Sequence, residues 1–368
     1  MWVTCQDCGK TERFDVRVFR CPCGGPWEPE ERKDFDESLI DQDSYSVWRY
    51  QDLLGTDGTD SPVKLGAGWT PLIEASWMGE KIFFKMEYLS ATGSFKDRGT
   101  EIEVSHLRAE GVKKVVEDSS GNAGASMAAY AARAGIQATI FAPESALPAK
   151  LAQIQVYGAK LEKIQGPRSE AARAVLKAAG EGAVYASHAY NPIYLLGQQT
   201  AAWEIWEQLD KTAPHAVVVP VGQGGLLLGI WWGFKRLLHA GLIQKMPKIF
   251  AVQPEIFSPI SHAVNKGLDE ILAYIPAGRS IADGLAIVQP VRGKRILQAL
   301  SESGGAALTV TEIEIEAAYH QLAENGFFVE PTSAAAAAAL QKVFRQVGKN
   351  GAIVIPLTGS GLKSPVRL

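Results

Sequence analysis

Three absences narrow the class of protein before any motif is considered. The 368 residues contain no apolar run long enough to span a bilayer. Lys and Arg total 37 against 40 Asp and Glu and are scattered along the chain, so no basic stripe is available for nucleic acid. Cysteine is absent after residue 23. These absences favour a small molecule as the substrate, and we expect neither a membrane nor a nucleic acid as partner.

The N-terminus also lacks the basic region and apolar core of a secretory signal, which predicts a cytoplasmic location. No internal repeat of about 20 to 50 residues is apparent. With 46% hydrophobic and 21% charged residues, the composition is typical of a soluble globular chain. The length is sufficient for two packed domains.

The four cysteines that are present form two short pairs, Cys5 with Cys8 and Cys21 with Cys23. In a reducing compartment such clustering favours a metal over disulfides. Two Cys-containing turns that face each other can place four thiolates in the tetrahedron that Zn²⁺ accepts, and a site with four thiolates is structural. The second pair is one residue closer than the usual spacing. Two disulfides, or a knuckle that has lost its metal, are the alternatives.

Further along the chain, short runs of β-branched and apolar residues alternate with longer Ala-rich segments of helical period. This alternation predicts an α/β fold with a parallel sheet. Before it, the charged run from Glu28 to Glu37 is expected to be a solvated surface, and a short helical patch is expected at 46–54. The predicted strands are 81–86, 113–117, 137–142, 183–186, 216–221, 248–253 and 352–357, with helices in the gaps.

One lysine, Lys96, follows a Gly-containing turn and stands among the first residues of a predicted helix. The positive end of a helix dipole disfavours the ammonium form, which helps to keep an amine free to attack a carbonyl. We therefore predict that Lys96 is the reactive group. An ordinary surface lysine beside Asp97 is the alternative.

A second turn, rich in Ser and Gly, joins the predicted strand at 113–117 to a helix predicted at 127–134. Backbone N–H groups at such a helix start can bind a carboxylate, and the hydroxyls of Ser119 and Ser120 add donors. A well-capped helix after a tight turn would explain the same residues.

Two more loops follow predicted strands. Residues 217–229 indicate a buried strand, a glycine loop and a helix, an arrangement in which several N–H groups can point at one phosphate. The loop lacks the ending of a nucleotide P-loop and the spacing of a dinucleotide site, and a plain turn is the alternative. Near the C-terminus, Thr358 stands at a strand end before glycines, where ligands of open α/β sheets gather.

Together these stretches resemble the threonine synthases, which are fold-type II pyridoxal-phosphate (PLP) enzymes. The family's active-site turn also reads Thr-Gly-Ser-Phe-Lys-Asp-Arg, as residues 92–98 do here, and the other three loops occur in the same order. The resemblance covers essentially the whole chain. It implies a two-domain α/β fold with parallel and mixed sheets, a small N-terminal Cys-rich zinc-ribbon-like knuckle, and PLP as cofactor. We also expect a homodimer.

The resemblance assigns roles to the residues of these loops. It places the neutral hydroxyl of Thr358 at the pyridine nitrogen of PLP. A neutral hydroxyl there makes the cofactor a weaker electron sink than a carboxylate would, which favours elimination and replacement reactions. The cofactor contacts that the resemblance implies are Lys96, as the covalent link, and its neighbour Phe95; Asn122 at the ring hydroxyl; Gly222, Gln223, Gly224, Gly225 and Leu226 at the phosphate; and Thr358 at the pyridine nitrogen. The implied contacts of the substrate carboxylate are Ser119, Ser120, Asn122 and Ala123.

A threonine synthase must also bind the phosphate of its substrate, which requires cationic or hydroxyl donors. Lys85, Thr92 and Ser94 are the candidates, because they lie on the strand and turn that lead to the lysine. The chain departs from the family pattern at three positions. Ser90 and Ala91 stand where Asn-Pro is common, and Ser360 stands where His is common. These positions bear on the choice of substrate.

The resemblance implies conversion of O-phospho-L-homoserine and water to L-threonine and phosphate. A PLP-dependent threonine or serine ammonia-lyase, or a β-replacement enzyme similar to cysteate synthase, is the alternative. A catalytically silent PLP fold is a third reading, which the presence of Lys96 opposes. The expected domains are a knuckle at 1–28, a linker or helical extension at 29–68 and a catalytic unit at 69–368. Within that unit, 92–190 forms the smaller domain, and 69–91 with 191–368 forms the larger one.

Overall fold

The computed structural model describes residues 1–30, 35–56, 59, 61–144, 146, 148–166 and 168–364. The chain folds into two compact units. The first unit comprises Met1–Gly68 and Ser90–Gly197 with a short piece at Lys363, and the second comprises Trp69–Leu89 and Gln198–Leu362. Parts of two predicted segments, residues 31–34 of the charged run and 365–368 of the larger domain, lie outside the described residues. The domain boundaries expected from the sequence stay a prediction.

The N-terminal part of the first unit is a three-stranded antiparallel sheet in the order β2-β1-β3. Its small core contains Val3, Trp27 and the buried cysteines Cys5 and Cys21. After this sheet come the short helical turns predicted near residues 46–54. The elements are β1 (Trp2–Cys5), β2 (Thr11–Arg13), β3 (Trp27–Pro29), η1 (Glu37–Leu39), η2 (Val47–Tyr50) and α1 (Gln51–Leu54).

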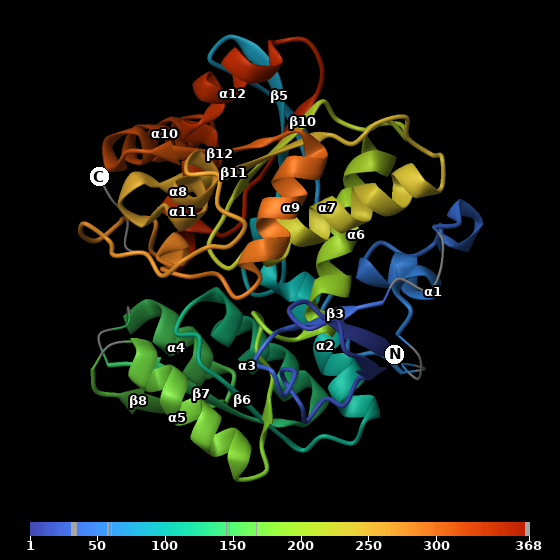
Figure 1. Cartoon of the computed structure of the whole chain (residues 1–368), viewed down its shortest axis with the longest axis vertical. Helices are drawn as coiled ribbons and strands as arrows, with labels where there is room; N and C mark the ends of the chain where they lie inside the picture. The colour runs from blue at the N-terminus through green and yellow to red at the C-terminus, as the bar shows by residue number, and fades with distance from the viewer. Residues whose placement is uncertain are drawn as a thin grey trace. The chain divides into compact units, whose positions relative to one another are not determined.

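The rest of the first unit is built on a parallel sheet in the order β8-β7-β6-β9 (Figure 1). Helix α3 packs on β6 and β7 and also against α2, while α5 packs on all four strands. The elements are α2 (Lys96–Ala109), β6 (Lys114–Glu117), α3 (Asn122–Ala134), β7 (Gln137–Pro143), α4 (Pro148–Val156), β8 (Lys160–Ile164), α5 (Arg168–Gly180) and β9 (Val184–Tyr185). Helix α6 (Pro192–Gln208) contains the boundary between the units.

The second unit contains a six-stranded sheet in the order β12-β11-β10-β13-β5-β4, parallel except for β4. The run Ala334–Ala337 is fully buried, and these small side chains let α11 approach β10, β11 and β13 closely. Helices α7 and α9 pack together on β11, as Figure 1 shows. The strands are β4 (Leu72–Trp77), β5 (Glu80–Lys85), β10 (Ala216–Pro220), β11 (Lys248–Pro254), β12 (Ala306–Val310) and β13 (Ile353–Pro356).

The remaining helices of the second unit complete its layers around the sheet. Helix α10 packs against α11, and α8 packs against β11, β12 and α9. They are η3 (Glu87–Leu89), α7 (Gly225–His239), η4 (Glu255–Phe257), α8 (Pro259–Asn265), η5 (Asp283–Leu285), α9 (Gly293–Ser303), α10 (Glu312–Glu324), α11 (Pro331–Ala338), α12 (Leu340–Val347) and η6 (Gly361–Lys363). Among the described residues, none of the helices combines the length and the apolar character needed to cross a bilayer.

The predicted α/β fold with parallel and mixed sheets is confirmed. Each predicted strand is present, with its ends displaced by no more than a residue or so. The sequence did not predict β4, β8 and β12, and these three are edge strands of the two larger sheets. An edge strand is solvated along one side and often carries charge, so its apolar pattern is weak. The strand β8, which reads Lys-Leu-Glu-Lys-Ile, is an example.

Candidate active site

The predicted reactive lysine is the first residue of helix α2. The preceding residue, Phe95, has helical backbone angles, and the Lys96 ammonium lies 4.6 Å from the centroid of the Phe95 ring. The Lys96 side chain is half-buried. The predicted position at a helix N-terminus is therefore confirmed. The role of Lys96 as the reactive amine stays a prediction, and the positive end of the helix dipole is consistent with it.

A fully buried carboxylate fixes the turn before this lysine. Asp97 accepts hydrogen bonds from the Thr92 amide at 2.7 Å, from the Thr92 hydroxyl at 2.5 Å and from the Ser126 hydroxyl at 2.7 Å. Burial raises the pKa of Asp97, and the bonds from Thr92 and Ser126 partly offset that rise. Ser126 belongs to α3, so Asp97 joins the lysine turn to the helix that follows the Ser119 turn.

These bonds argue against the predicted role of Thr92 in binding the substrate phosphate. The amide and hydroxyl donors of Thr92 both point to Asp97. Its carbonyl oxygen accepts from Lys363 Nζ at 2.7 Å and from Gln153 Nε2 at 3.0 Å. Thr92 therefore shapes the turn. Neither Lys363 nor Gln153 carries a sequence signal of this role, because both are far from Thr92 along the chain.

Ser94 has the opposite character. Its side chain is fully buried, and its hydroxyl oxygen has no hydrogen-bond partner among the described residues. Leaving a buried hydroxyl without a partner costs free energy, so native proteins rarely tolerate it. A polar ligand atom beside Ser94 would satisfy this hydroxyl, as the predicted ligand role requires.

The Ser119 turn lies just past the carboxyl end of β6, and α3 begins at Asn122, five residues earlier than predicted. Gly121 precedes the helix without a side-chain cap. A Cβ on Gly124 would lie 1.9 Å from the Ser119 carbonyl oxygen, so only glycine fits there. The Ser119 backbone is thus held close to the start of α3, and the Ser119 hydroxyl oxygen accepts a hydrogen bond from the Gly121 amide at 3.3 Å. This arrangement suits the predicted carboxylate contact.

In the second unit, the glycine loop connects β10 to α7 as predicted, and the helix begins at Gly225. Gly224 has φ +87°, and a Cβ there would lie 2.4 Å from the Ile296 side chain. The Gln223 side chain accepts a hydrogen bond from the Val291 amide at 3.1 Å, and this bond anchors the loop to the segment that contains Val291. A glycine backbone before a helix start presents N–H groups to an anion.

Thr358 follows the end of β13 and is almost completely buried. Its hydroxyl oxygen lies 3.0 Å from that of Ser333, on α11. Ser360 pairs with Val329 in an isolated β-bridge. Ser333 was not predicted as a functional residue from the sequence.

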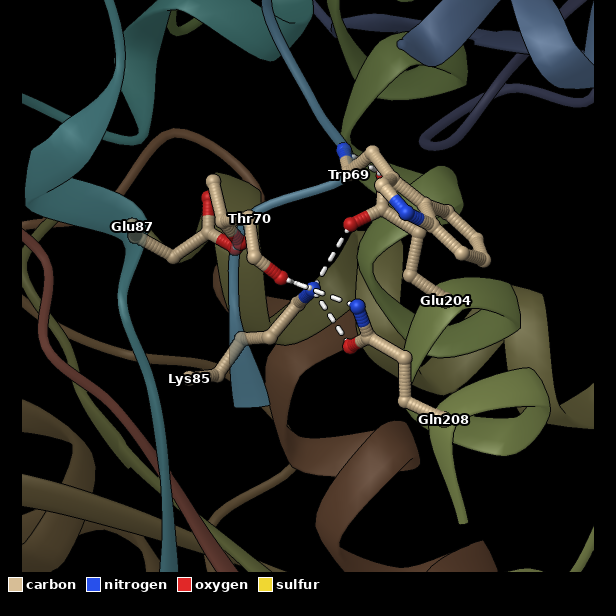
Figure 2. Close-up of polar contacts among 6 residues, drawn as sticks. All are labelled: Trp69, Thr70, Lys85, Glu87, Glu204 and Gln208. Carbon is tan, nitrogen blue, oxygen red and sulfur yellow. Dashed lines mark hydrogen bonds and ion pairs between the residues drawn. The ribbon is translucent and has the colours of Figure 1, made fainter. Parts of the chain in front are cut away.

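The structure argues against the predicted role of Lys85 in binding the substrate phosphate (Figure 2). The Lys85 side chain is 0% exposed, and its ammonium donates to Glu204 at 2.7 Å, to Gln208 at 2.9 Å and to the Thr70 carbonyl oxygen at 2.5 Å. An ammonium has three N–H donors, so these bonds occupy all of them. Lys85 is a structural cation that joins β5 to α6 within the second unit.

The partners of Lys85 are themselves held in place (Figure 2). The second carboxylate oxygen of Glu204 accepts from the Trp69 amide at 2.8 Å. The Thr70 hydroxyl donates to Glu87 at 2.9 Å. A buried charge is tolerated only when it is paired and hydrogen-bonded, and this cluster meets that condition.

The four cysteines come together as predicted. All four are free thiols, and their sulfur atoms lie within 4.8 Å of one another. The Cys5 and Cys23 sulfurs are 3.4 Å apart, and those of Cys8 and Cys21 are 3.7 Å apart. Four sulfurs at about 2.3 Å from a central zinc would be separated by similar distances. The alternative of two disulfides is not what the structure contains.

Comparison with known proteins identifies the family. The family described as "Pyridoxal-phosphate dependent enzyme" matches residues 63–359. A threonine synthase of Methanocaldococcus jannaschii is 37% identical over 98% of this chain and 92% of its own length. The chain belongs to the threonine synthase family of PLP-dependent enzymes. Another family member, from Mycobacterium leprae, is 36% identical over 86% of this chain and 88% of its own.

Solved structures of other enzymes share the fold. A threonine deaminase whose source is abbreviated T.th. superposes with a TM-score of 0.71 at 27% identity, covering 81% of this chain and 94% of that one. Maize serine racemase superposes with a TM-score of 0.69, also at 27% identity, covering 81% and 89%. This chain therefore shares the fold of these two enzymes.

The residues present fit the cofactor of the family. The first unit supplies Lys96 at a helix start and, at Ser94, a buried hydroxyl without a partner among the described residues. The second unit supplies a glycine loop before α7 and a buried threonine hydroxyl at the carboxyl end of β13. An amine, an anion-binding loop and a neutral hydroxyl are the groups that an aldehyde, a phosphate and a pyridine nitrogen require.

Proposed function

We propose that this protein is a threonine synthase, which converts O-phospho-L-homoserine and water to L-threonine and phosphate. The observation that carries the proposal is the match to threonine synthases at 37% identity over 98% of the chain. The position of Lys96 as the first residue of α2 supports it, because this lysine occupies the family's Thr-Gly-Ser-Phe-Lys turn.

In this proposal each loop has a defined task. PLP, when bound, withdraws electrons from the substrate's carbon skeleton and so makes protons at its Cα and Cβ acidic. Lys96 Nζ would hold the cofactor in the resting enzyme and would move the protons at the substrate's Cα and Cβ. The overall reaction releases phosphate from Cγ and adds water at Cβ. Ser119, Ser120, Asn122 and Ala123 bind the substrate carboxylate through hydroxyl, amide and backbone N–H donors.

The cofactor is held by groups that do not react. The backbone of Gly222, Gln223, Gly224, Gly225 and Leu226 would bind its phosphate, Asn122 would contact its ring hydroxyl, and Thr358 would contact the pyridine nitrogen. Phe95 lies beside the lysine. Of the three candidates for the substrate phosphate, Ser94 keeps that role, because its hydroxyl alone has no partner among the described residues.

An ammonia-lyase acting on threonine or serine is the second candidate. The structural similarity to a threonine deaminase favours it, as do Ser90, Ala91 and Ser360, which depart from the threonine synthase pattern. The two functions differ in their products. Purified protein loaded with PLP is therefore incubated with O-phospho-L-homoserine and, separately, with L-threonine, while phosphate, threonine and 2-oxobutyrate are followed. Phosphate release with threonine formation supports the synthase, whereas 2-oxobutyrate from threonine alone supports the lyase.

We further propose that Cys5, Cys8, Cys21 and Cys23 bind one structural Zn²⁺. The mutual distances of their sulfur atoms support this proposal, and so does the close approach of Gly25 to Cys5. A Cβ on Gly25 would lie 2.8 Å from the Cys5 sulfur, so the turn closes directly over the site. Four thiolates leave no open coordination position, and the metal therefore has no part in the chemistry.

We also propose a cytoplasmic homodimer. Four free thiols at metal-binding distances are suited to a reducing compartment, where they stay available as ligands. Sedimentation equilibrium of the PLP-loaded protein tests the oligomeric state, and a mass of one chain would overturn the dimer. Fractionation of source cells followed by immunodetection tests the location.

A further inference from the structure

The hydroxyl of Ser333 lies within hydrogen-bond distance of the hydroxyl of Thr358. Ser333 is the third residue of α11, which begins with Pro331, and its side chain is 0% exposed. Thr358 is 3% exposed and follows the end of β13. The two oxygen atoms lie 3.0 Å apart, so one hydroxyl donates to the other. Which of them donates decides how Thr358 meets a ligand.

The surroundings of Ser333 determine where its single proton points. The Gly359 amide donates to the Ser333 oxygen at 2.9 Å, so that oxygen already serves as an acceptor. Its proton has two possible acceptors, the Thr358 oxygen at 3.0 Å and the Gly359 carbonyl oxygen at 3.3 Å. The carbonyl oxygen also accepts from the Glu330 amide at 2.9 Å. The shorter distance and the less occupied acceptor both favour donation from Ser333 to Thr358.

When Ser333 donates to Thr358, the hydroxyl proton of Thr358 is available for another acceptor. Among the described residues, Ser333 is the only hydrogen-bond partner of the Thr358 hydroxyl. A buried hydroxyl normally makes a bond with its own proton as well, since leaving it unmade costs free energy. Thr358 is thus prepared as a donor, aimed at a ligand atom that accepts.

We infer that Ser333 is a positioning residue that makes Thr358 a hydrogen-bond donor to the pyridine nitrogen of PLP. The inference rests on the proposed function, which places that nitrogen at Thr358. An unprotonated pyridine nitrogen is an acceptor only, and a protonated one is a donor only. A threonine locked as a donor therefore selects the unprotonated ring. An unprotonated ring withdraws electrons less strongly, which limits side reactions that need a strongly stabilised carbanion.

The test uses PLP labelled with ¹⁵N in the ring and bound to the full-length protein. The ¹⁵N chemical shift and the visible absorbance of the bound cofactor are recorded for wild type, Ser333→Ala and Ser333→Thr. Wild type is expected to show the shift of an unprotonated, hydrogen-bonded nitrogen. Ser333→Ala is expected to move both signals and to lower kcat about 3- to 10-fold with little change in KM, because it removes one neutral hydrogen bond. Ser333→Thr, which keeps the hydroxyl, is expected to restore both signals.

A double-mutant cycle with Thr358→Val separates positioning from a general loss of packing. If Ser333 acts through Thr358, adding Ser333→Ala to Thr358→Val leaves the ¹⁵N shift and kcat unchanged. Additive effects would overturn the inference. Ser303→Ala is the matched control, because Ser303 is a buried serine of the same unit that bonds Ile249 and Leu300 instead. It is expected to leave the cofactor signals at their wild-type positions.

The possible failures can be told apart. Wild-type protein that binds PLP and makes threonine, but in which Ser333→Ala leaves both cofactor signals unchanged, would overturn the role of Ser333 alone. A protonated ring nitrogen in wild type would do the same. Wild-type protein that binds no PLP would overturn the proposed function, and the inference with it.

Discussion

The ammonium of Lys85 lies 2.7 Å from the carboxylate of Glu204, and neither side chain is exposed to solvent. The two residues are 119 positions apart in the sequence. Both charges are taken out of water, and the cost of doing so is offset by their attraction and by the bonds to Thr70, Gln208 and Trp69. The pair links a strand and a helix of the second unit, and its contribution should therefore appear in stability.

Lys85→Ala is expected to lower the free energy of unfolding by about 3 to 5 kcal/mol, because it leaves the Glu204 carboxylate buried without its cation. Denaturant titration of the PLP-loaded protein measures the loss. Lys81→Ala is the matched control, since Lys81 pairs with Glu74 on the surface, where the side chains are 62% and 58% exposed. That change is expected to cost less than about 1 kcal/mol. Equal losses in the two variants would contradict the structural role of Lys85.

Wild-type protein incubated with PLP is expected to be yellow, because the covalent link to Lys96 gives the cofactor a visible absorbance band. Lys96→Ala is expected to abolish that band and to reduce activity to background. Absorbance spectroscopy and borohydride trapping followed by peptide mass analysis measure the link. Lys163→Ala, which alters an exposed lysine on β8, is the control. A wild type without the band, or a trapped cofactor on another lysine, would refute the assignment.

Protein purified without oxygen is expected to contain one zinc per chain, measured by elemental analysis. Cys8→Ser is expected to lose most of the metal, because it removes one of four thiolates. Chelation is expected to loosen the N-terminal sheet while the absorbance of bound PLP persists, since the cysteines lie in a core of their own. Hydrogen exchange by mass spectrometry localises the change. Metal-free wild-type protein would rule out the zinc site.

Glu103 predicts a pH dependence of stability. Burial raises its pKa from 4.5 to about 8, and its hydrogen bond from Asn191 only partly opposes that shift. The folded protein therefore holds a proton that the unfolded chain releases near pH 4.5, so stability falls as pH rises from about 4.5 to about 8. The slope from this group is at most about 1.4 kcal/mol per pH unit.

Glu103→Gln is expected to remove this part of the pH dependence, because glutamine has no proton to lose in that range. Free energies of unfolding measured at several pH values between 5 and 8 test it. Glu110→Gln, at the exposed end of the same helix, is the matched control. The prediction is refuted if the wild type and Glu103→Gln show the same slope.

Local sequence patterns were sufficient to predict most of the strands that form the core. The strands 216–221 and 352–357 are recognisable because they are continuous apolar runs, and burial on both faces of a parallel sheet requires such runs. The turn before Lys96 and the loop at Gly222 are also local, since glycine is needed where the backbone adopts unusual angles or passes close to other atoms. The two pairs of cysteines are also recognisable from short stretches of sequence, because their spacing indicates a shared site.

The sequence by itself thus determined the α/β class, the position of Lys96 at a helix start and the four-cysteine cluster. Only the tertiary structure decided which polar side chains are already engaged. Lys85 and Thr92 look like ligand donors in the sequence, yet Glu204 and Asp97 occupy them, while Ser94 keeps a hydroxyl without a partner among the described residues. Ser333 likewise reaches Thr358 from 25 residues away. The physical reason is that burial and hydrogen-bond partners are set by segments distant along the chain, and no local pattern records which segments will meet.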